Sequence, residues 1–477
     1  MTKILDKPLI QWPMGHPFTI RNACEGVLIL GGLGSGKTSG SGALLAQKYL
    51  TNKFGGLVLT AKEEEIELWK NYCQKYNRLD DLIIFGPDSG YSFNFLNYES
   101  SRNDKAQGIV HNIADTLKTV IKAGASDGQE SDKAFWDTAL QQLLVNTVDL
   151  CLLATKKIKF EHLYKVVQSA PKTRQQLNNP QWRAQSQCFK LMHHVASHLK
   201  DVPKSKEHDA LARRLYSIED FFLGNWLNLS EKTRSIVEQM FFGFGDRFMR
   251  DPLYSLFNST TDQEITPEDT IKGKIIVINL PYLIYENTGR DGQILFKYVW
   301  QRAMQRRKIK ENSRPTFLWV DEAHYFLHDH DIDHQSTARS YRACTVYLTQ
   351  NLPNFSLHFG GRDKGMHQFK ALAGNLGTKF FHANSDVETN EYASELIGKK
   401  IQWMANENIS VGDDNMIMSE GSSQSLIHII QSSDFARQKT GGPLNNYEIE
   451  TIVHRQGIPF ENTGRNYALF TINQRNL

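Results

Sequence analysis

Features that would place this chain outside the cytosol or in a membrane are scarce in its sequence. Among 477 residues there are only five cysteines, without paired spacing, which excludes a disulfide framework or a cysteine zinc cluster and favours reduced thiols. Residues 1–8 contain no apolar core of a signal peptide. The most apolar stretch, Leu140 to Ala154, is interrupted by polar residues and is too short to span a bilayer, so we expect a buried helix there. We therefore expect a cytoplasmic protein without a membrane span of its own, which only a partner would recruit to the inner membrane.

Charge is nearly balanced over the whole chain but not along it. There are 55 Lys and Arg against 52 Asp and Glu. The stretch from Thr155 to Arg214 holds nine Lys and four Arg against four acidic residues, a net charge of +9, so the rest of the chain carries −6. A basic block in an otherwise acidic chain is a candidate footprint for nucleic-acid phosphates, and a solvated helical face explains it as well. Lys297 to Arg314 is a second basic stretch.

Short apolar segments bounded by turn residues predict a mainly parallel sheet. They are Gly26–Leu30, Gly56–Thr60, Leu82–Phe85, Ile275–Leu280, Phe317–Val320, Thr345–Leu348 and Lys379–Phe381. Several have apolar residues on both faces, as buried parallel strands do, and helical patterns such as Gly292 to Lys310 lie between them. From about residue 101 to 258 only helical patterns occur. We predict an α/β nucleotide-binding domain made of residues 1–100 and 259–477, with an all-α domain, residues 101–258, inserted into it.

A glycine-rich segment, Gly31-Gly32-Leu33-Gly34-Ser35-Gly36-Lys37-Thr38, follows the first predicted strand and opens a predicted helix. In this context the backbone N–H groups of Gly31, Gly34, Ser35 and Gly36 turn inward around an anion, and the helix dipole favours negative charge. Lys37 is expected to reach the β- and γ-phosphates of ATP, and Thr38 Oγ to bind Mg²⁺. The segment therefore predicts a P-loop that binds ATP and Mg²⁺.

Two later strands end in residues suited to the same site. The predicted strand before Asp321-Glu322 is typical of a Walker B segment, in which Asp321 holds Mg²⁺ and Glu322 orients and deprotonates the attacking water. The next strand ends at Gln350. Because the ends of parallel strands meet at one crevice, Gln350 is expected to contact the γ-phosphate or the water.

A positive charge from a neighbouring subunit commonly stabilises the transition state of phosphoryl transfer. Arg339 and Arg342 both lie shortly before the strand that ends at Gln350. On these grounds alone either arginine fits this role, and a surface role fits each of them equally well.

Together these residues resemble the type IV coupling proteins of conjugation and type IV secretion (the TraD/TraG group), within the HerA/FtsK superfamily of ring motors. The resemblance covers most of the chain. It rests on the P-loop, on Asp321-Glu322, Arg339 and Gln350 at the family's spacing, and on shorter elements such as Phe135-Trp136 at the start of the helical region. The family's N-terminal transmembrane helices are not seen here, and Thr60-Ala61 stands where the family has Asp-Pro.

The resemblance implies a RecA-like P-loop NTPase that couples ATP hydrolysis to the translocation of DNA or DNA–protein cargo. It also implies a homohexamer with ATP at each subunit interface, and it selects Arg339 over Arg342 as the arginine finger. Residues 155–214, and with them residues 297–314, would receive DNA without sequence preference, in a salt-dependent manner. Relaxase or secretion-channel proteins are the expected partners.

Other functions stay open at this point. Asp321-Glu322-Ala323-His324 spells the DEAH box of helicases, although 284 residues separate Lys37 from Asp321 and no Gln-x-x-Gly-Arg element follows. The segment from His324 to His334 offers imidazole and carboxylate ligands for zinc or manganese, without the spacing of a known metal site. A double-stranded DNA pump of the HerA/FtsK kind, acting in genome maintenance or phage defence, and an ATP-binding adaptor that recruits protein cargo without translocation also fit. Residues 446–477 are strand-rich and have no assigned role.

Overall fold

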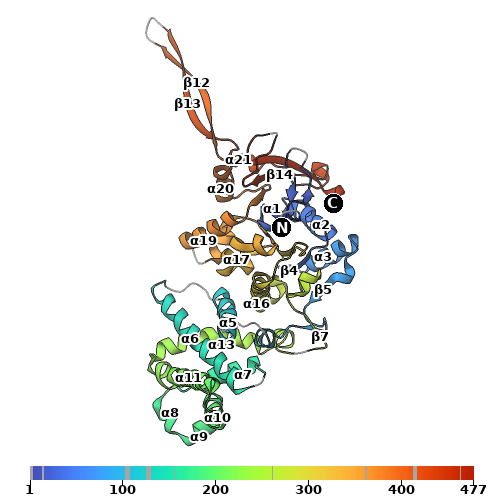
Figure 1. Ribbon diagram of the computed structural model, residues 1–477. Helices are drawn as coiled ribbons and strands as arrows, with labels where there is room; N and C mark the ends of the chain where they lie inside the picture. The colour runs from blue at the N-terminus through green and yellow to red at the C-terminus, as the bar shows by residue number, and fades with distance from the viewer. Residues whose placement is uncertain are drawn as a thin grey trace. The chain divides into compact units, whose positions relative to one another are not determined.

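The computed structural model describes residues 4–12, 15–102, 108–124, 130–155, 157–259, 261–359, 362–411, 416–461 and 463–477 (Figure 1). The chain divides into two compact units. Unit 1 comprises Met1–Phe54, Ile309–His324 and Gln335–Leu477, and unit 2 comprises Gly55–Lys308 and Tyr325–His334.

Unit 1 is built on strands in the order β15-β14-β11-β3-β10-β9. Four of them run parallel: β11 (Thr378–Phe381), β3 (Val27–Leu30), β10 (Ala343–Thr349) and β9 (Thr316–Val320). The antiparallel strands β14 (Glu448–Arg455) and β15 (Tyr467–Asn473) extend the sheet beyond β11. Every residue of the four parallel strands is buried, which confirms that continuous apolar segments form the centre of a sheet covered on both faces.

Helices and short strands surround this sheet within unit 1. They are α1 (Ile20–Cys24), α2 (Ala43–Thr51), α18 (Leu352–His358), α19 (Arg362–Asn375), α20 (Val387–Ile397) and α21 (Ser432–Phe435), with the strand pair β1 (Pro8–Ile10) and β2 (Phe18–Thr19). Tyr49 of α2 lies against Phe317 of β9, with ring centroids 5.7 Å apart. This contact packs the helix after the P-loop onto the strand that leads to Asp321.

A long hairpin, which the sequence did not predict, extends from α20 (Figure 1). It consists of β12 (Lys399–Val411) and β13 (Met416–His428), paired antiparallel along their full length. Trp403 is 64% exposed on it. In the sequence of β12, apolar residues at 401, 403, 405, 409 and 411 alternate with polar ones, so a strand signal is present there, whereas β13 has no regular alternation.

Unit 2 contains the three parallel strands β4 (Gly55–Leu59), β8 (Ile275–Ile278) and β5 (Leu82–Phe85), in that order. The helices α3 (Glu64–Lys75), α4 (Phe95–Ser100), α15 (Asp269–Lys272) and α16 (Tyr282–Arg306) and the short strands β6 (Tyr91–Ser92) and β7 (Gln263–Glu264) accompany them. Helix α16 starts ten residues earlier than the predicted Gly292 because a turn at Glu286 (φ 46°, ψ −128°) joins two helical segments.

The rest of unit 2 is helical. Between residues 101 and 258 the described residues form no strand. The helices are α5 (Ile109–Gly124), α6 (Glu130–Ala154), α7 (Phe160–Gln168), α8 (Arg174–Asn178), α9 (Pro180–Gln185), α10 (Gln187–Asp201), α11 (Lys206–Asp220), α12 (Trp226–Asn228), α13 (Glu231–Phe248) and α14 (Leu253–Phe257). Phe160 is at the centre of this group, 5.7 Å from the Phe244 ring and 5.8 Å from the Phe248 ring.

These elements confirm the predicted fold class, a P-loop α/β fold with a mainly parallel sheet and an all-α region. The domain boundaries after residues 100 and 258 stay a prediction.

Leu140 to Ala154 lies within α6, as expected of a buried helix. In the part of the chain that the structure describes, no helix combines the length and the apolar character needed to cross a membrane. All five cysteines are buried, and none of them forms a disulfide bond with another described residue.

Candidate active site

The predicted site residues come from three distant segments. They meet at the carboxyl-terminal ends of the parallel strands in the unit 1 sheet. The register pairs Thr349 at the end of β10 with Leu30 at the end of β3, so the residues that follow both strands lie side by side. Thr38 Oγ1 donates a hydrogen bond to Asp321 Oδ2 at 2.8 Å. Gln350 Nε2 donates to Glu322 Oε1 at 3.1 Å, and Lys37 Nζ lies 3.7 Å from the same oxygen. Lys37, Thr38, Asp321, Glu322 and Gln350 therefore form one cluster.

The glycines of the loop are required by its conformation. Gly34 (φ +69°) and Gly36 (φ +84°) adopt left-handed backbone angles that favour glycine. A Cβ atom at Gly36 would lie 2.5 Å from Ile449 Cδ1, and one at Gly31 would lie 2.4 Å from Ser35 Oγ. The loop is thus held in a tight ring that a side chain at Gly36 or Gly31 would break.

Ser35 Oγ is a buried polar atom that makes no hydrogen bond with any of the described residues. Such an atom is costly unless a ligand satisfies it. After Thr38 the chain turns through a π-helical turn (Thr38–Gly42) into α2. A buried hydroxyl and a helix start at the same loop suit an anion such as a phosphate group.

The acidic half of the cluster is buried and conformationally strained. Glu322 is only 2% exposed, and its φ of +48° is unusual for a residue with a side chain. Its N–H donates to Asp321 Oδ1 at 2.9 Å, which fixes the two carboxylates relative to each other. Thr349 Oγ1 lies 3.2 Å from His324 Nδ1, so the segment that follows the acidic pair is also anchored to β10. A carboxylate held in this way by an amide and an ammonium group is placed to accept a proton from a water molecule.

The oxygens of Thr38 and Asp321 form a donor set that fits Mg²⁺. The ion prefers hard oxygen ligands and usually takes one or two carboxylates together with phosphate and water. The hydroxyl and the carboxylate are 2.8 Å apart. By contrast, the described residues contain no group of three or more His, Cys, Asp or Glu side chains arranged to hold a metal ion, which removes the support for a zinc or manganese site in residues 324–334.

Two residues that follow β11 also lie at the carboxyl-terminal ends of the parallel strands. The sequence analysis did not identify them as site residues. Ser41 Oγ lies 2.8 Å from His382 Nε2, which joins the turn before α2 to the end of β11. Burial, reinforced by the nearby Lys37 charge, lowers the pKa of His382 to about 3, so its ring is neutral. Asn384 Nδ2 donates to the Gln350 carbonyl at 2.8 Å. The predicted strand Lys379–Phe381 contained the signal, because its carboxyl end meets the same crevice as Gln350.

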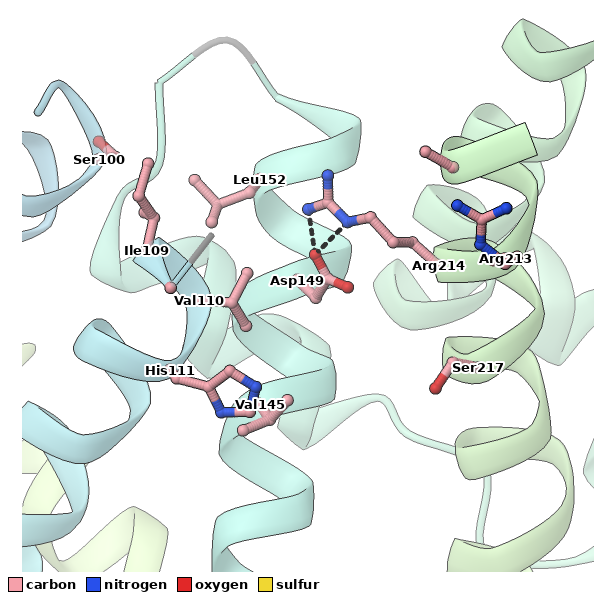
Figure 2. Close-up of a pocket in the computed structure, with 12 residues that line it drawn as sticks. Ser100, Ile109, Val110, His111, Val145, Asp149, Leu152, Arg213, Arg214 and Ser217 are labelled. Carbon is pink, nitrogen blue, oxygen red and sulfur yellow. Dashed lines mark hydrogen bonds and ion pairs between the residues drawn. The ribbon is translucent and has the colours of Figure 1, made fainter. Parts of the chain in front are cut away.

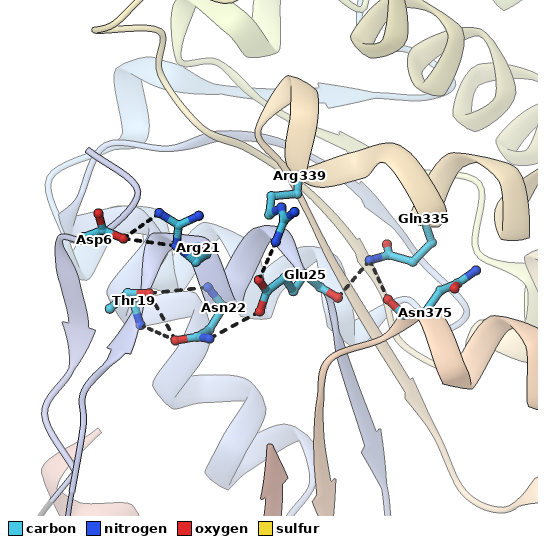
Figure 3. A network of polar contacts seen from close by, with 8 residues as sticks. All are labelled: Asp6, Thr19, Arg21, Asn22, Glu25, Gln335, Arg339 and Asn375. Atoms are coloured by element: carbon cyan, nitrogen blue, oxygen red, sulfur yellow. Dashed lines mark hydrogen bonds and ion pairs between the residues drawn. The ribbon is translucent and has the colours of Figure 1, made fainter. Parts of the chain in front are cut away.

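Arg339 lies near the amino-terminal ends of the parallel strands, whereas Lys37 lies near their carboxyl-terminal ends. Its Nη1 donates to Glu25 Oε1 at 3.2 Å, and its side chain is 59% exposed (Figure 3). Glu25 stands just before β3, whereas the P-loop follows β3, so the length of a strand, roughly 15 Å at about 3.3 Å per residue, separates the two. Arg339 is therefore too far from its own P-loop to reach a phosphate there.

Glu25 is itself firmly held. Gln335 Nε2, in α17 (His330–Thr337), donates to the Glu25 carbonyl at 3.0 Å and to the Asn375 carbonyl at 3.3 Å (Figure 3). Asn22 Nδ2 donates to the second carboxylate oxygen of Glu25 at 3.3 Å. The partner of Arg339 is thus fixed through both its main chain and its side chain.

Arg342, the other arginine that the sequence left open, is buried. It is 2% exposed, and its Nη1 donates to the carbonyls of Glu311 at 2.9 Å and Ser313 at 2.7 Å. These two hydrogen bonds from its guanidinium hold the loop before β9 in place. Arg342 therefore has a structural role, and of the two arginines only Arg339 is accessible.

The basic residues of the 155–214 stretch lie on the helices α7 to α11 and on the segments that precede and connect them. Twelve of the thirteen are described, and all twelve are exposed. Two of them have acidic partners: Lys172 Nζ binds Glu238, and Arg214 Nε donates to Asp149 Oδ1 at 3.0 Å (Figure 2). Arg213 and Arg214 also border a cavity of about 770 Å³ whose other walls include His111 and Val145 (Figure 2).

The second basic stretch is only partly a charged surface, because Lys308 and Lys310 are exposed and Lys297 is not. Lys297 is fully buried, and its Nζ donates to Asp331 Oδ2 and to the Phe326 carbonyl, both at 2.7 Å. Arg306 Nη2 donates to Glu99 Oε1 at 3.1 Å. The expectation that residues 297–314 contact DNA is wrong for Lys297, because periodicity alone did not reveal that it points into unit 2.

Comparisons with known proteins concern the family and the fold. A family model described as the TraM recognition site of TraD and TraG matches residues 315–439. The bacterial conjugative coupling protein TrwBdeltaN70, in an unbound form, matches with a TM-score of 0.56 and 14% identity over 99% of this chain and 89% of that chain. TrwB matches in complex with the ATP analogue ADPNP (TM-score 0.55) and in complex with ADP and Mg²⁺ (TM-score 0.54), each with 14% identity over 98% of this chain and 90% of that chain.

A comparison of the sequence with curated proteins finds no match. The solved structures show that the chain has the fold of TrwB. Together with the family model, they confirm the resemblance to the type IV coupling proteins.

Proposed function

We propose, starting from this resemblance, that the chain is an ATP-hydrolysing ring motor that moves DNA or DNA–protein cargo, as the coupling ATPase of conjugation and type IV secretion. The observation that carries the proposal is the cluster of Lys37, Thr38, Asp321, Glu322 and Gln350 at one sheet edge. TrwB, which shares the fold, is described in complex with an ATP analogue and with ADP and Mg²⁺.

Each member of the cluster has a role that follows from its position. Lys37 and the N–H groups of Gly31, Gly34, Ser35 and Gly36 bind the phosphates, and the buried Ser35 hydroxyl finds its partner there. Glu322 orients the attacking water and accepts its proton. Gln350 donates to Glu322 and thereby links the state of the γ-phosphate to β10. Mg²⁺, held by Thr38 and Asp321, supplies neutralisation of charge on the phosphate oxygens when bound.

Arg339 completes the site of a neighbouring subunit. The exposed guanidinium and the strand length between Arg339 and Lys37 support an action in trans. In a closed ring of head-to-tail subunits, one edge of each subunit faces the opposite edge of the next. A homohexamer with ATP at each interface satisfies this requirement.

The exposed cations on α7 to α11 support the binding of DNA phosphates without sequence preference. The description of the matched family model names recognition of TraM, which supports protein partners of the relaxosome or of the secretion channel. Relaxase and channel proteins remain the partners that we propose.

ATP turnover measured with and without DNA tests this function. We expect hydrolysis by the wild-type chain, its loss in Lys37→Ala and Glu322→Gln, and retention of ATP binding in Glu322→Gln because that residue acts on the water. Six-fold rings in particle images would support the assembly. No turnover by the wild-type chain, and no difference between the variants, would contradict the motor and favour an ATP-binding adaptor.

The double-stranded DNA pump remains the second candidate for the motor. It differs in the nucleic acid that stimulates turnover, because a pump of this kind acts on duplex DNA. Stimulation by duplex but not by single-stranded DNA would favour it over the coupling ATPase.

A further inference from the structure

Two segments near the C-terminus, residues 441–449 and 473–475, lie beside the first turn after the P-loop (Figure 1). We call them the C-terminal wall. Ile449 of β14 lies close enough to Gly36 and Gly40 that a Cβ atom on either glycine would be within 2.8 Å of its Cδ1 atom. Gln474 Nε2 donates to Ser39 Oγ at 2.9 Å. The wall is thus in direct contact with the loop and with the residue that follows Thr38.

The position of the wall relative to the catalytic cluster indicates which part of a nucleotide it faces. Lys37, Glu322 and Gln350 surround the γ-phosphate end of the proposed site. Ser39 follows Thr38 into the helix, and the α-phosphate and the nucleoside extend along this side of a P-loop, away from the attacking water. The C-terminal wall therefore stands beside the nucleoside end.

The wall carries a flat, partly exposed surface. The guanidinium of Arg475 stacks over the Tyr447 ring at 4.0 Å from its centroid. Leu444, in the same turn, is 99% exposed. Aromatic rings and arginine planes both stack on nucleobases, and stacking of this kind tolerates different bases.

The turn that presents this surface is strained and tied to the loop. Asn446 (φ +53°) and Tyr447 (φ +62°) both adopt left-handed backbone angles, which are uncommon for residues with side chains. Gln474 Oε1 accepts the N–H of Gly442 at 2.9 Å while its amide binds Ser39, so one side chain connects the turn to the P-loop helix. Strained backbone persists where the surrounding structure enforces it, and it concentrates at ligand sites.

We propose that the C-terminal wall binds the nucleoside of the nucleotide, with the Tyr447–Arg475 pair as the stacking surface for the base and Leu444 against its edge. This inference rests on the proposed ATP site. It assigns a function to residues 441–475, beyond the catalytic cluster, and it makes nucleosides, without preference for one base, the class of ligand.

Binding of ATP and of inorganic tripolyphosphate to the full chain tests the proposal, because tripolyphosphate has the phosphates without the nucleoside. We expect Tyr447→Ala and Arg475→Ala to weaken ATP binding roughly tenfold, the value of a base–aromatic stack, and to leave tripolyphosphate binding unchanged. Tyr467→Ala is the matched control, since it lies at the other end of β15 from Gln474. Lys37→Ala should weaken the binding of both ligands.

Three results separate the possibilities. Unchanged ATP binding in Tyr447→Ala and Arg475→Ala overturns the wall while the ATP site stands. An equal loss of ATP and tripolyphosphate binding also overturns it, because the substitutions would then act through the shape of the P-loop. A wild-type chain that binds neither ligand refutes the ATP site itself, and the inference with it.

Discussion

Replacement of Arg339 by alanine distinguishes a catalytic arginine from a surface ion pair, and Arg342→Ala is its matched control. The two residues are three positions apart in the sequence, but one is exposed and the other is buried. If Arg339 stabilises the transition state in a neighbouring subunit, its loss lowers turnover with little effect on folding. If Arg342 only closes the loop before β9, its loss lowers stability with little effect on the chemistry of the folded protein.

The structure sets the size of both effects. The Arg339–Glu25 pair is largely solvated, so its loss costs about 0–1 kcal/mol of folding free energy. Loss of an arginine finger lowers kcat roughly 10³-fold or more. Arg342 donates to two carbonyls, and leaving such groups unsatisfied costs about 1–3 kcal/mol each, so Arg342→Ala should destabilise the protein by roughly 2–6 kcal/mol.

Phosphate release at saturating ATP, ATP binding and thermal unfolding are measured for both variants. Arg339→Ala should bind ATP normally, keep its Tm and lose turnover. Mixing it with Lys37→Ala tests the action in trans, because each variant is inactive alone. In randomly mixed rings about a quarter of the interfaces combine an intact P-loop with an intact Arg339 from the next subunit, and these should recover activity.

Normal turnover in Arg339→Ala would refute the reasoning from exposure and strand length. Failure of the mixed rings to recover would refute the action in trans while leaving the ATPase itself in place. A loss of turnover in Arg342→Ala at a temperature where it is folded would show that burial was the wrong criterion for choosing between the two arginines.

Three further predictions concern charge. Burial lowers the pKa of His328, His334 and His382 to about 3, against about 6.5 in the unfolded chain, so the unfolded state takes up protons first as the pH falls below about 6.5. Each histidine should therefore cost about 1.4 kcal/mol of stability at about pH 5.5, and asparagine at these positions should reduce the fall in Tm. Lys297→Met leaves Asp331 buried without its cation and should cost about 3–5 kcal/mol in urea unfolding, whereas the double variant Lys297→Met/Asp331→Leu should recover part of this loss. Glutamine at Lys200, Lys204 and Lys206 should lower the slope of log DNA affinity against log salt by about 2–3, and Lys364→Gln, in unit 1, should not change it.

The central strands and the main site residues were predictable because the information is local or follows from strand direction. The P-loop is one continuous segment, and its glycines are explained by the left-handed angles at Gly34 and Gly36. Asp321 and Gln350 each follow an apolar strand, and parallel strands bring their ends together whatever the loops between them.

His382 and Asn384 were missed although they follow a predicted strand, because neither forms part of a known motif and their partners, Ser41 and Gln350, are distant in sequence. The β12–β13 hairpin was missed although apolar and polar residues alternate in β12, because β13 is mostly polar and has no regular alternation that would mark it as the partner strand. The C-terminal wall depends on β14, which pairs antiparallel with β11 and brings Ile449 to the P-loop.

The sequence by itself determined the glycine-rich loop, the acidic pair and the α/β order of elements, because these depend on neighbours in the chain and on the repeat of apolar residues. Only the tertiary structure decided which lysine and arginine side chains are exposed and can contact another molecule. Arg342 and Lys297 carry the same charge as Arg339, but packing buries them against carbonyls and a carboxylate. The exposure of a charged side chain depends on segments far away in the chain, and these come together only in the folded protein.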